Sequence, residues 1–256
     1  MLDRAKQIEG YKLSSLDGEI GKVKEFYFDD KFWTIRYLVA DTGNWLTGRQ
    51  VLISPYALTD VNRLEQIIAV NLTKDKIKNS PLPDSDKPVS RQFENFYYGY
   101  YGWPGYWGGP YSWGAHPSIV HNDERSRELA QGGKAFDLHL RSTRTVTSYH
   151  IEASDGEIGH VEDFIIDDNT WVIRYLIVDT RNWLPGKRVL ISPQWIQNVS
   201  WHESTISVNV PRDAIRQAPE YISDSSLTRD QETELYRHYK REGYWADEPV
   251  VPLLAV

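Results

Sequence analysis

The sequence predicts a mainly β protein made of two tandem small β-barrels, with short helices and an aromatic-rich segment that connects the barrels. Three observations lead to this prediction: a long internal repeat, short runs of β-branched and aromatic residues, and turn-forming residues between those runs. Each predicted element recurs in the second half of the chain, so the two halves are expected to fold alike.

The repeat has a constant offset of 138 residues, because the segment DGEIG begins at Asp17 and again at Asp155. From Tyr11 to Pro55, 26 of the 45 positions are identical in the second copy. The register persists to Gly105-Tyr106-Trp107, which matches Gly243-Tyr244-Trp245. We therefore expect a first barrel unit over residues 1–107, a linker rich in Gly, Pro and charged residues over 108–137, a second unit over 138–245 and a tail over 246–256.

The first predicted elements of each unit form a hairpin. Val23–Phe28 and Ile35–Ala40 are β-branched and aromatic runs, and Asp29-Asp30-Lys31 between them favours a turn. Val51–Ile53 follows a turn at Thr47-Gly48. These runs predict three consecutive strands.

Later elements are clearer in the second copy. Thr205–Val210 alternates strictly, which directs Ile206, Val208 and Val210 to the interior. Pro211 opens a short helix that ends before Pro219. A sheet of short strands with turns this tight is best satisfied by closing into a barrel, which removes its edges.

Composition and motif spacing exclude several classes of function. The formal net charge of −7 disfavours a nucleic-acid partner, and the lack of cysteine excludes thiolate nucleophiles and Cys-ligated metals. The seven histidines show no H-E-x-x-H spacing, and neither Ser54-Pro55 nor Ser192-Pro193 lies in a G-x-S-x-G motif. We expect no catalytic residue, no metal and no cofactor.

The repeated acids invite two interpretations. Asp29-Asp30, Asp41 and their copies are carboxylates that could serve acid–base chemistry or a hard metal, but each lies at a strand end where Asp is the usual turn former. Arginine between apolar neighbours calls for a buried partner. We predict structural ion pairs or turns at four positions: Arg36, Asp41, Arg174 and Asp179.

The segment from Phe93 to Trp113 holds 11 aromatic residues, and regular secondary structure is not expected after Tyr101. One interpretation is packing across a barrel or between the barrels. The other is a protein-recognition surface, because Tyr and Trp dominate interface hot spots. The candidate partner-binding residues are Tyr98, Tyr101, Trp103, Tyr106 and Trp107.

The ordered motifs DGEIG-x-V, DD-x-x-W-x-IRYL, DT-x-NWL and VLISP, present twice, resemble the PRC-barrel family in its soluble, tandem bacterial form. That family is named after the cytoplasmic domain of the photosynthetic reaction-centre H subunit. The resemblance implies a strongly bent small barrel used for binding and assembly, with no family-wide catalytic residue.

We therefore expect a non-enzymatic adaptor or assembly module that binds a protein partner. No signal peptide or membrane-inserting segment is evident, which predicts a cytoplasmic location. Homo-oligomerisation stays open. The alternative from another class is a small-ligand-binding protein or a carboxylate- or metal-dependent hydrolase.

Overall fold

The computed structural model describes residues 1–43, 45–46, 50–81, 89–106, 139–180, 186–222 and 226–246. The first unit contains β2 (Lys12–Ser15), β3 (Gly18–Asp29), β4 (Thr34–Asp41), β5 (Gln50–Ile53), β6 (Leu58–Asn62) and β7 (Ile67–Val70), with helices η1 (Pro55–Ala57), α2 (Lys74–Lys78) and α3 (Arg91–Tyr101). The second contains β9 (His150–Ala153), β10 (Gly156–Asp167), β11 (Val172–Asp179), β12 (Arg188–Ile191), β13 (Ile196–Ser200) and β14 (Thr205–Val208), with η2 (Pro193–Trp195), α6 (Arg212–Gln217), α7 (Arg229–His238) and η3 (Tyr244–Ala246).

Both units have the same sheet order, which confirms the predicted repeat. In the first unit the order is β5-β4-β3-β2-β7-β6, with β2 parallel to β7 and the other pairs antiparallel. The second unit repeats it as β12-β11-β10-β9-β14-β13. Register shifts at Val23 and Tyr27 of β3, and at Val161 and Ile165 of β10, mark the positions where each long strand bends around its core.

The DGEIG motif shapes the first hairpin of each unit. Asp17 accepts a hydrogen bond from the Lys74 amide at 2.7 Å, which ties the turn to the start of α2, and Asp155 does the same for the Arg212 amide. Gly21 has a φ of +138°, and a Cβ there would overlap the carbonyl oxygen of Asp41. The second glycine of the motif is therefore fixed by close approach of two strands.

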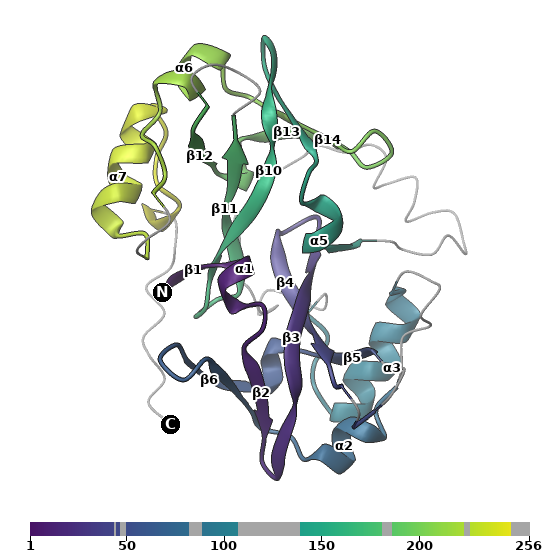
Figure 1. Cartoon of the computed structure of the whole chain (residues 1–256). Helices are drawn as coiled ribbons and strands as arrows, with labels where there is room; N and C mark the ends of the chain where they lie inside the picture. Colours follow the sequence, from purple (N-terminus) through teal and green to yellow (C-terminus); the bar gives the residue numbers. More distant parts are fainter. Residues whose placement is uncertain are drawn as a thin grey trace.

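An exchange of N-terminal arms was not expected from the sequence. The arm of unit 1 is β1 (Leu2–Arg4) with α1 (Ala5–Ile8), and β1 pairs with β10 of unit 2. The arm of unit 2 is β8 (Leu140–Ser142) with α5 (Thr143–Val146), and β8 pairs with β3 of unit 1. Figure 1 shows both arms at the junction of the two units.

The two units are also joined directly. The Ile35 amide donates to the Trp171 carbonyl and the Ile173 amide donates to the Trp33 carbonyl, each at 2.7 Å, which makes a short bridge between β4 and β11. The described strands thus form one 14-stranded sheet that is not closed within either unit. The fold class is confirmed, but the expectation of separately closed sheets is wrong, because the units are linked through the β4–β11 bridge and through the arms β1 and β8.

The buried hydrophobic residues form a single cluster that extends through both units. At the junction, the rings of Phe28 and Phe164 lie 6.0 Å apart, centroid to centroid. The longer helices cover opposite flanks of the molecule, α3 beside unit 1 and α7 beside unit 2 (Figure 1). The helix predicted after Pro211 is α6, with Pro211 at its N-cap.

Candidate functional site

The most polar part of the interior is a pair of equivalent charge clusters, one in each unit. In unit 1, Arg36 of β4 donates from Nε and Nη2 to Oδ2 of Asp29, at 2.8 and 2.6 Å. The other oxygen, Oδ1 of Asp29, accepts from the amides of Lys31 and Phe32. One carboxylate therefore both shapes the β3–β4 turn and neutralises a buried guanidinium, whose carbon lies 3.9 Å from the ring centroid of Tyr106.

Glu94 of α3 is fully buried and is linked to this cluster through Tyr106. Its Oε1 accepts hydrogen bonds from the hydroxyls of Tyr37 at 3.1 Å and Tyr106 at 2.7 Å. Its Oε2 lies 3.0 Å from Nη1 of Arg91 and 2.9 Å from Nε2 of His139. A buried carboxylate needs such partners, so Glu94 fastens the helix to the barrel strand β4.

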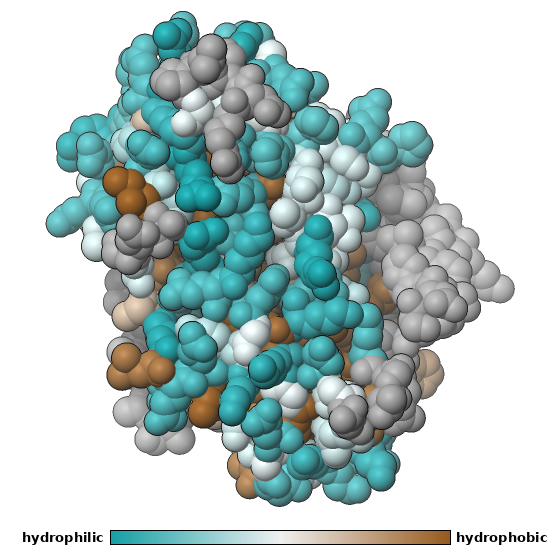
Figure 2. Space-filling view, viewed as in Figure 1, coloured by the Kyte–Doolittle hydropathy of each residue, from teal (hydrophilic) through white to brown (hydrophobic). Residues whose placement is uncertain are grey.

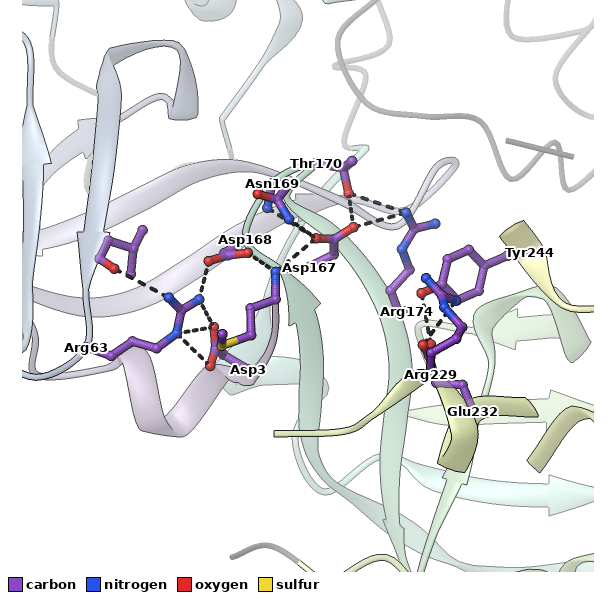
Figure 3. Close-up of polar contacts among 12 residues, drawn as sticks. Asp3, Arg63, Asp167, Asp168, Asn169, Thr170, Arg174, Arg229, Glu232 and Tyr244 are labelled. Carbon is purple, nitrogen blue, oxygen red and sulfur yellow. Dashed lines mark hydrogen bonds and ion pairs between the residues drawn. The ribbon is translucent and has the colours of Figure 1, made fainter. Parts of the chain in front are cut away.

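The second unit repeats the arrangement around Glu232 of α7. Tyr175 and Tyr244 donate to its Oε1 at 2.7 and 2.8 Å, and Nη1 of Arg229 lies 3.0 Å from its Oε2. Arg174 pairs with Asp167 at 3.1 Å and stacks over Tyr244 (Figure 3). Burial raises the pKa of Glu232, and the tyrosine hydrogen bonds oppose that effect.

A second set of ion pairs joins the units. Arg63, from the β6–β7 turn of unit 1, pairs with Asp3 of its own arm and with Asp168 of unit 2 (Figure 3). On the opposite side, Arg141 pairs with Asp30 at 2.9 Å and stacks over Trp201. The second aspartate of each DD pair therefore serves the contact between units, whereas the first serves the turn.

The four predicted ion-pair or turn residues divide between two roles. Arg36 and Arg174 are buried in ion pairs, with Asp29 and Asp167 as their carboxylate partners rather than Asp41 and Asp179. Asp41 accepts from the Gly43 amide at 3.0 Å, which is a turn contact. Asp179 is buried at the end of β11, where its carbonyl oxygen faces Gly159.

The predicted partner-binding aromatics lie mostly inside the molecule. Tyr98, Tyr101 and Tyr106 are buried, and Trp103 is half-buried and stacks on Tyr101 with 4.4 Å between ring centroids. Burial also raises the pKa of Tyr101 to about 12. Trp107 lies outside the described residues. The four described rings therefore pack α3 onto its barrel.

Two other aromatics of α3 face solvent: Phe96 is 75 % exposed and Tyr100 is 37 % exposed. They are four residues apart and so share one face of the helix. Sequence reasoning placed them in the aromatic segment but did not select them. The repeat itself indicates that they are exposed, because the offset pairs them with the polar residues Glu234 and His238 of α7.

Figure 2 shows a largely hydrophilic face on which hydrophobic residues are scattered in small groups. Within the described residues, no group of three or more His, Asp or Glu side chains is arranged to hold a metal ion. No helix of that part of the chain is both long and apolar enough to cross a bilayer.

Fold and site together define a tandem-repeat β protein whose repeated polar groups serve its internal architecture. The PRC-barrel domain model matches residues 2–77 and 151–215, more than half of the chain, and the chain belongs to this family. The family resemblance predicted from the sequence motifs is thereby confirmed. A search among curated proteins found no match.

Proposed function

We propose that this tandem PRC-barrel chain is a non-enzymatic adaptor or assembly module that binds a protein partner. The observation that carries the proposal is the contrast between interior and surface. The two units have the same buried charge clusters, but the outer faces of their helices differ, with Phe96 and Tyr100 on α3 and Glu234 and His238 on α7. The shared fold does not need exposed aromatics at those positions, since unit 2 lacks them.

The ion pairs and hydrogen bonds of the repeated carboxylates also favour an adaptor over a hydrolase. Asp29 and Asp167 neutralise buried arginines, while Asp30 and Asp168 hold the units together. Carboxylates used for acid–base work need a reacting group within hydrogen-bond reach. These four are instead occupied by guanidinium groups and backbone amides, and that occupation suits a rigid binding scaffold.

The test uses the full chain, because exchanged arms leave neither unit whole by itself. The chain is incubated in native lysate and lightly cross-linked, and captured proteins are then purified and tested for direct binding. The proposal predicts at least one purified protein that rebinds at a fixed stoichiometry. Divalent-metal-dependent turnover of ester or phosphate substrates that is lost in a chain carrying Asp30→Asn and Asp168→Asn would instead establish the hydrolase alternative.

A further inference from the structure

The outer face of α3 differs in character from the equivalent face of α7 in unit 2. On α3 the exposed residues are Gln92, Asn95, Phe96, Gly99 and Tyr100, and none of them carries a charge. On α7 the exposed residues are Arg229, Asp230, Gln231, Glu234 and Arg237, most of which are charged. The same scaffold position is therefore uncharged, with two exposed aromatic rings, in one unit and a charged, solvated face in the other.

The α3 face has an exposed aromatic pair beside a glycine with open space above it. Phe96 and Tyr100 stand one helical turn apart, and Gly99 lies on the same side of the helix. Nothing lies within 4 Å of the position where a Cβ of Gly99 would be. A side chain from a partner can therefore pack over Gly99, beside the aromatic pair.

Lys76 of α2 lies beside this aromatic pair, and Lys78 is on the same short helix. The Tyr100 hydroxyl donates to the Lys76 carbonyl at 2.9 Å, which holds the C-terminal half of α3 against α2. Lys76 and Lys78 are exposed, and Nζ of Lys76 lies 5.9 Å from the ring centroid of Tyr101. Asp75 is the one exposed acid on α2. The equivalent of Lys78 in unit 2 is the exposed Arg216, but that of Lys76 is Ala214, so unit 1 has one more basic residue here.

We infer that the α3 face of unit 1, defined by Phe96, Gly99, Tyr100, Lys76 and Lys78, docks an acidic peptide segment of a partner protein through an apolar anchor residue. This inference rests on the proposed adaptor function and assigns it to one surface. The aromatic pair supplies the contact area, and the lysines select for carboxylates around the anchor.

A peptide fits this face better than an anionic membrane does. The chain carries a net charge of −7, and a flat bilayer would face much of that charge at once. A short peptide interacts mainly with charges within about one Debye length, ~8 Å at physiological salt. Within that range, it meets the lysine border rather than the acidic remainder of the molecule.

The experiment screens the full chain against two phage-displayed libraries of 16-residue peptides. Both contain Leu, Phe or Trp at pairs of positions four apart, and the remaining positions favour Asp and Glu in one library and Lys and Arg in the other. Enriched peptides are synthesised, and their affinities are measured by fluorescence anisotropy for the unaltered chain, Phe96→Glu, Lys76→Glu and the matched control Glu234→Ala.

We expect enrichment from the acidic library only. Phe96→Glu and Lys76→Glu should each weaken binding about tenfold or more, as for hot-spot residues, whereas Glu234→Ala should leave the affinity within about twofold. Phe96→Glu should keep the thermal stability of the parent chain, because unit 2 carries Glu at the same position of α7.

Three outcomes would overturn the inference. The first is equal enrichment from both libraries or from neither. The second is binding of the enriched peptides that Phe96→Glu leaves unchanged. The third is Phe96-dependent binding to phosphatidylserine vesicles without peptide binding, which would identify a membrane as the occupant. A purified protein partner that binds Phe96→Glu normally would keep the adaptor function and reject only this surface.

Discussion

At the residue scale, Gly21 and Gly159 show how a sequence motif encodes a bend. Their φ values are +138° and +151°, and any Cβ would overlap the carbonyl oxygen of Asp41 or Asp179 on the next strand. We predict that Gly21→Ala lowers the free energy of unfolding by about 3 kcal/mol or more, from backbone strain together with overlap. Chemical denaturation followed by circular dichroism measures this change.

The matched control is Gly99→Ala on the exposed face of α3, where the added methyl group meets no atom. Alanine is the better helix former, so this variant should be neutral or more stable by up to about 1 kcal/mol. If both substitutions had the same effect, close strand approach would not be the reason for the second glycine of DGEIG.

Asp167 provides a pH-dependent contribution to stability. Its burial favours the neutral acid, but the charge of Arg174 and hydrogen bonds from Thr170 and Asn169 outweigh burial and hold its pKa below the usual value. A lowered pKa in the folded state means that the stabilisation is complete above the unfolded value of about 4 and is lost as the pH falls below it, through the lower pKa of the folded state.

We therefore predict that Asp167→Asn costs about 3 kcal/mol near pH 7, because Arg174 stays buried without its carboxylate. The difference from the parent chain should shrink as the pH falls from 5 to 3, which urea unfolding at several pH values measures. The exposed control Asp60→Asn should give the parent profile. A difference that stays constant down to pH 3 would contradict the assigned ion pair.

Sequence reasoning found the buried arginines but not their partners. Arg36 lies between apolar residues, which identifies it as a buried charge that needs a carboxylate. Several aspartates recur with the repeat, and spacing along the chain does not rank them. The hairpin register selects Asp29, because β3 and β4 close through the turn that Asp29 itself holds.

At the element scale, the arms β1 and β8 are the elements whose partners the sequence could not identify. They occupy equivalent positions at the repeat offset, and pairing with the unit's own long strand or with the other unit's strand would satisfy the same backbone groups. The structure selects exchange. Arg4 pairs with Asp163 at 2.9 Å, and the Thr143 hydroxyl receives the Phe26 amide at 3.2 Å.

Arm exchange predicts a crossed effect of truncation. Deletion of residues 1–6 should expose β10 of unit 2, since β1 pairs with Ile165–Asp167. Hydrogen–deuterium exchange should accelerate in peptides covering residues 163–168, while peptides covering 25–29, paired with β8, should keep their protection. Faster exchange confined to β3 would mean that the arm stabilises its own unit instead.

Helices α3 and α7 show how far the repeat extends. Ser90 and Thr228 cap them, and the pattern Arg-x-x-Glu-x-x-x-Tyr-x-x-Tyr recurs from Arg91 and Arg229. In unit 1 this spacing lies within an aromatic-rich segment, which obscures it. Comparison of the two copies residue by residue would have selected Glu94 and Glu232, whose burial no local signal indicates.

At the scale of the whole molecule, the duplication made the fold class and the strand pattern predictable. Each apolar run and each turn is supported twice, so chance agreement is small. The continuous sheet was not predictable, because the bridge between Thr34 and Val172 joins strands whose sequences equally suit a closed barrel. Whether a strand pairs within its own unit or with the other unit depends on which strand edge lies nearer in the folded structure. The sequence of a single strand does not specify this.

The joined sheet, the exchanged arms and the single core predict that both units unfold together. Separation of the units would unpair both arms, break the Arg63–Asp168 and Arg141–Asp30 pairs and expose the contact of Phe28 with Phe164. Scanning calorimetry should show one transition with a calorimetric enthalpy near 180 kcal/mol, from about 0.7 kcal/mol per residue, and an equal van't Hoff enthalpy. Two resolved transitions, or a van't Hoff enthalpy of roughly half that value, would show that the units are independent. The variant Asp30→Asn with Asp168→Asn weakens the inter-unit pairs alone, so it should lower the melting temperature and is the change most suited to splitting the transition.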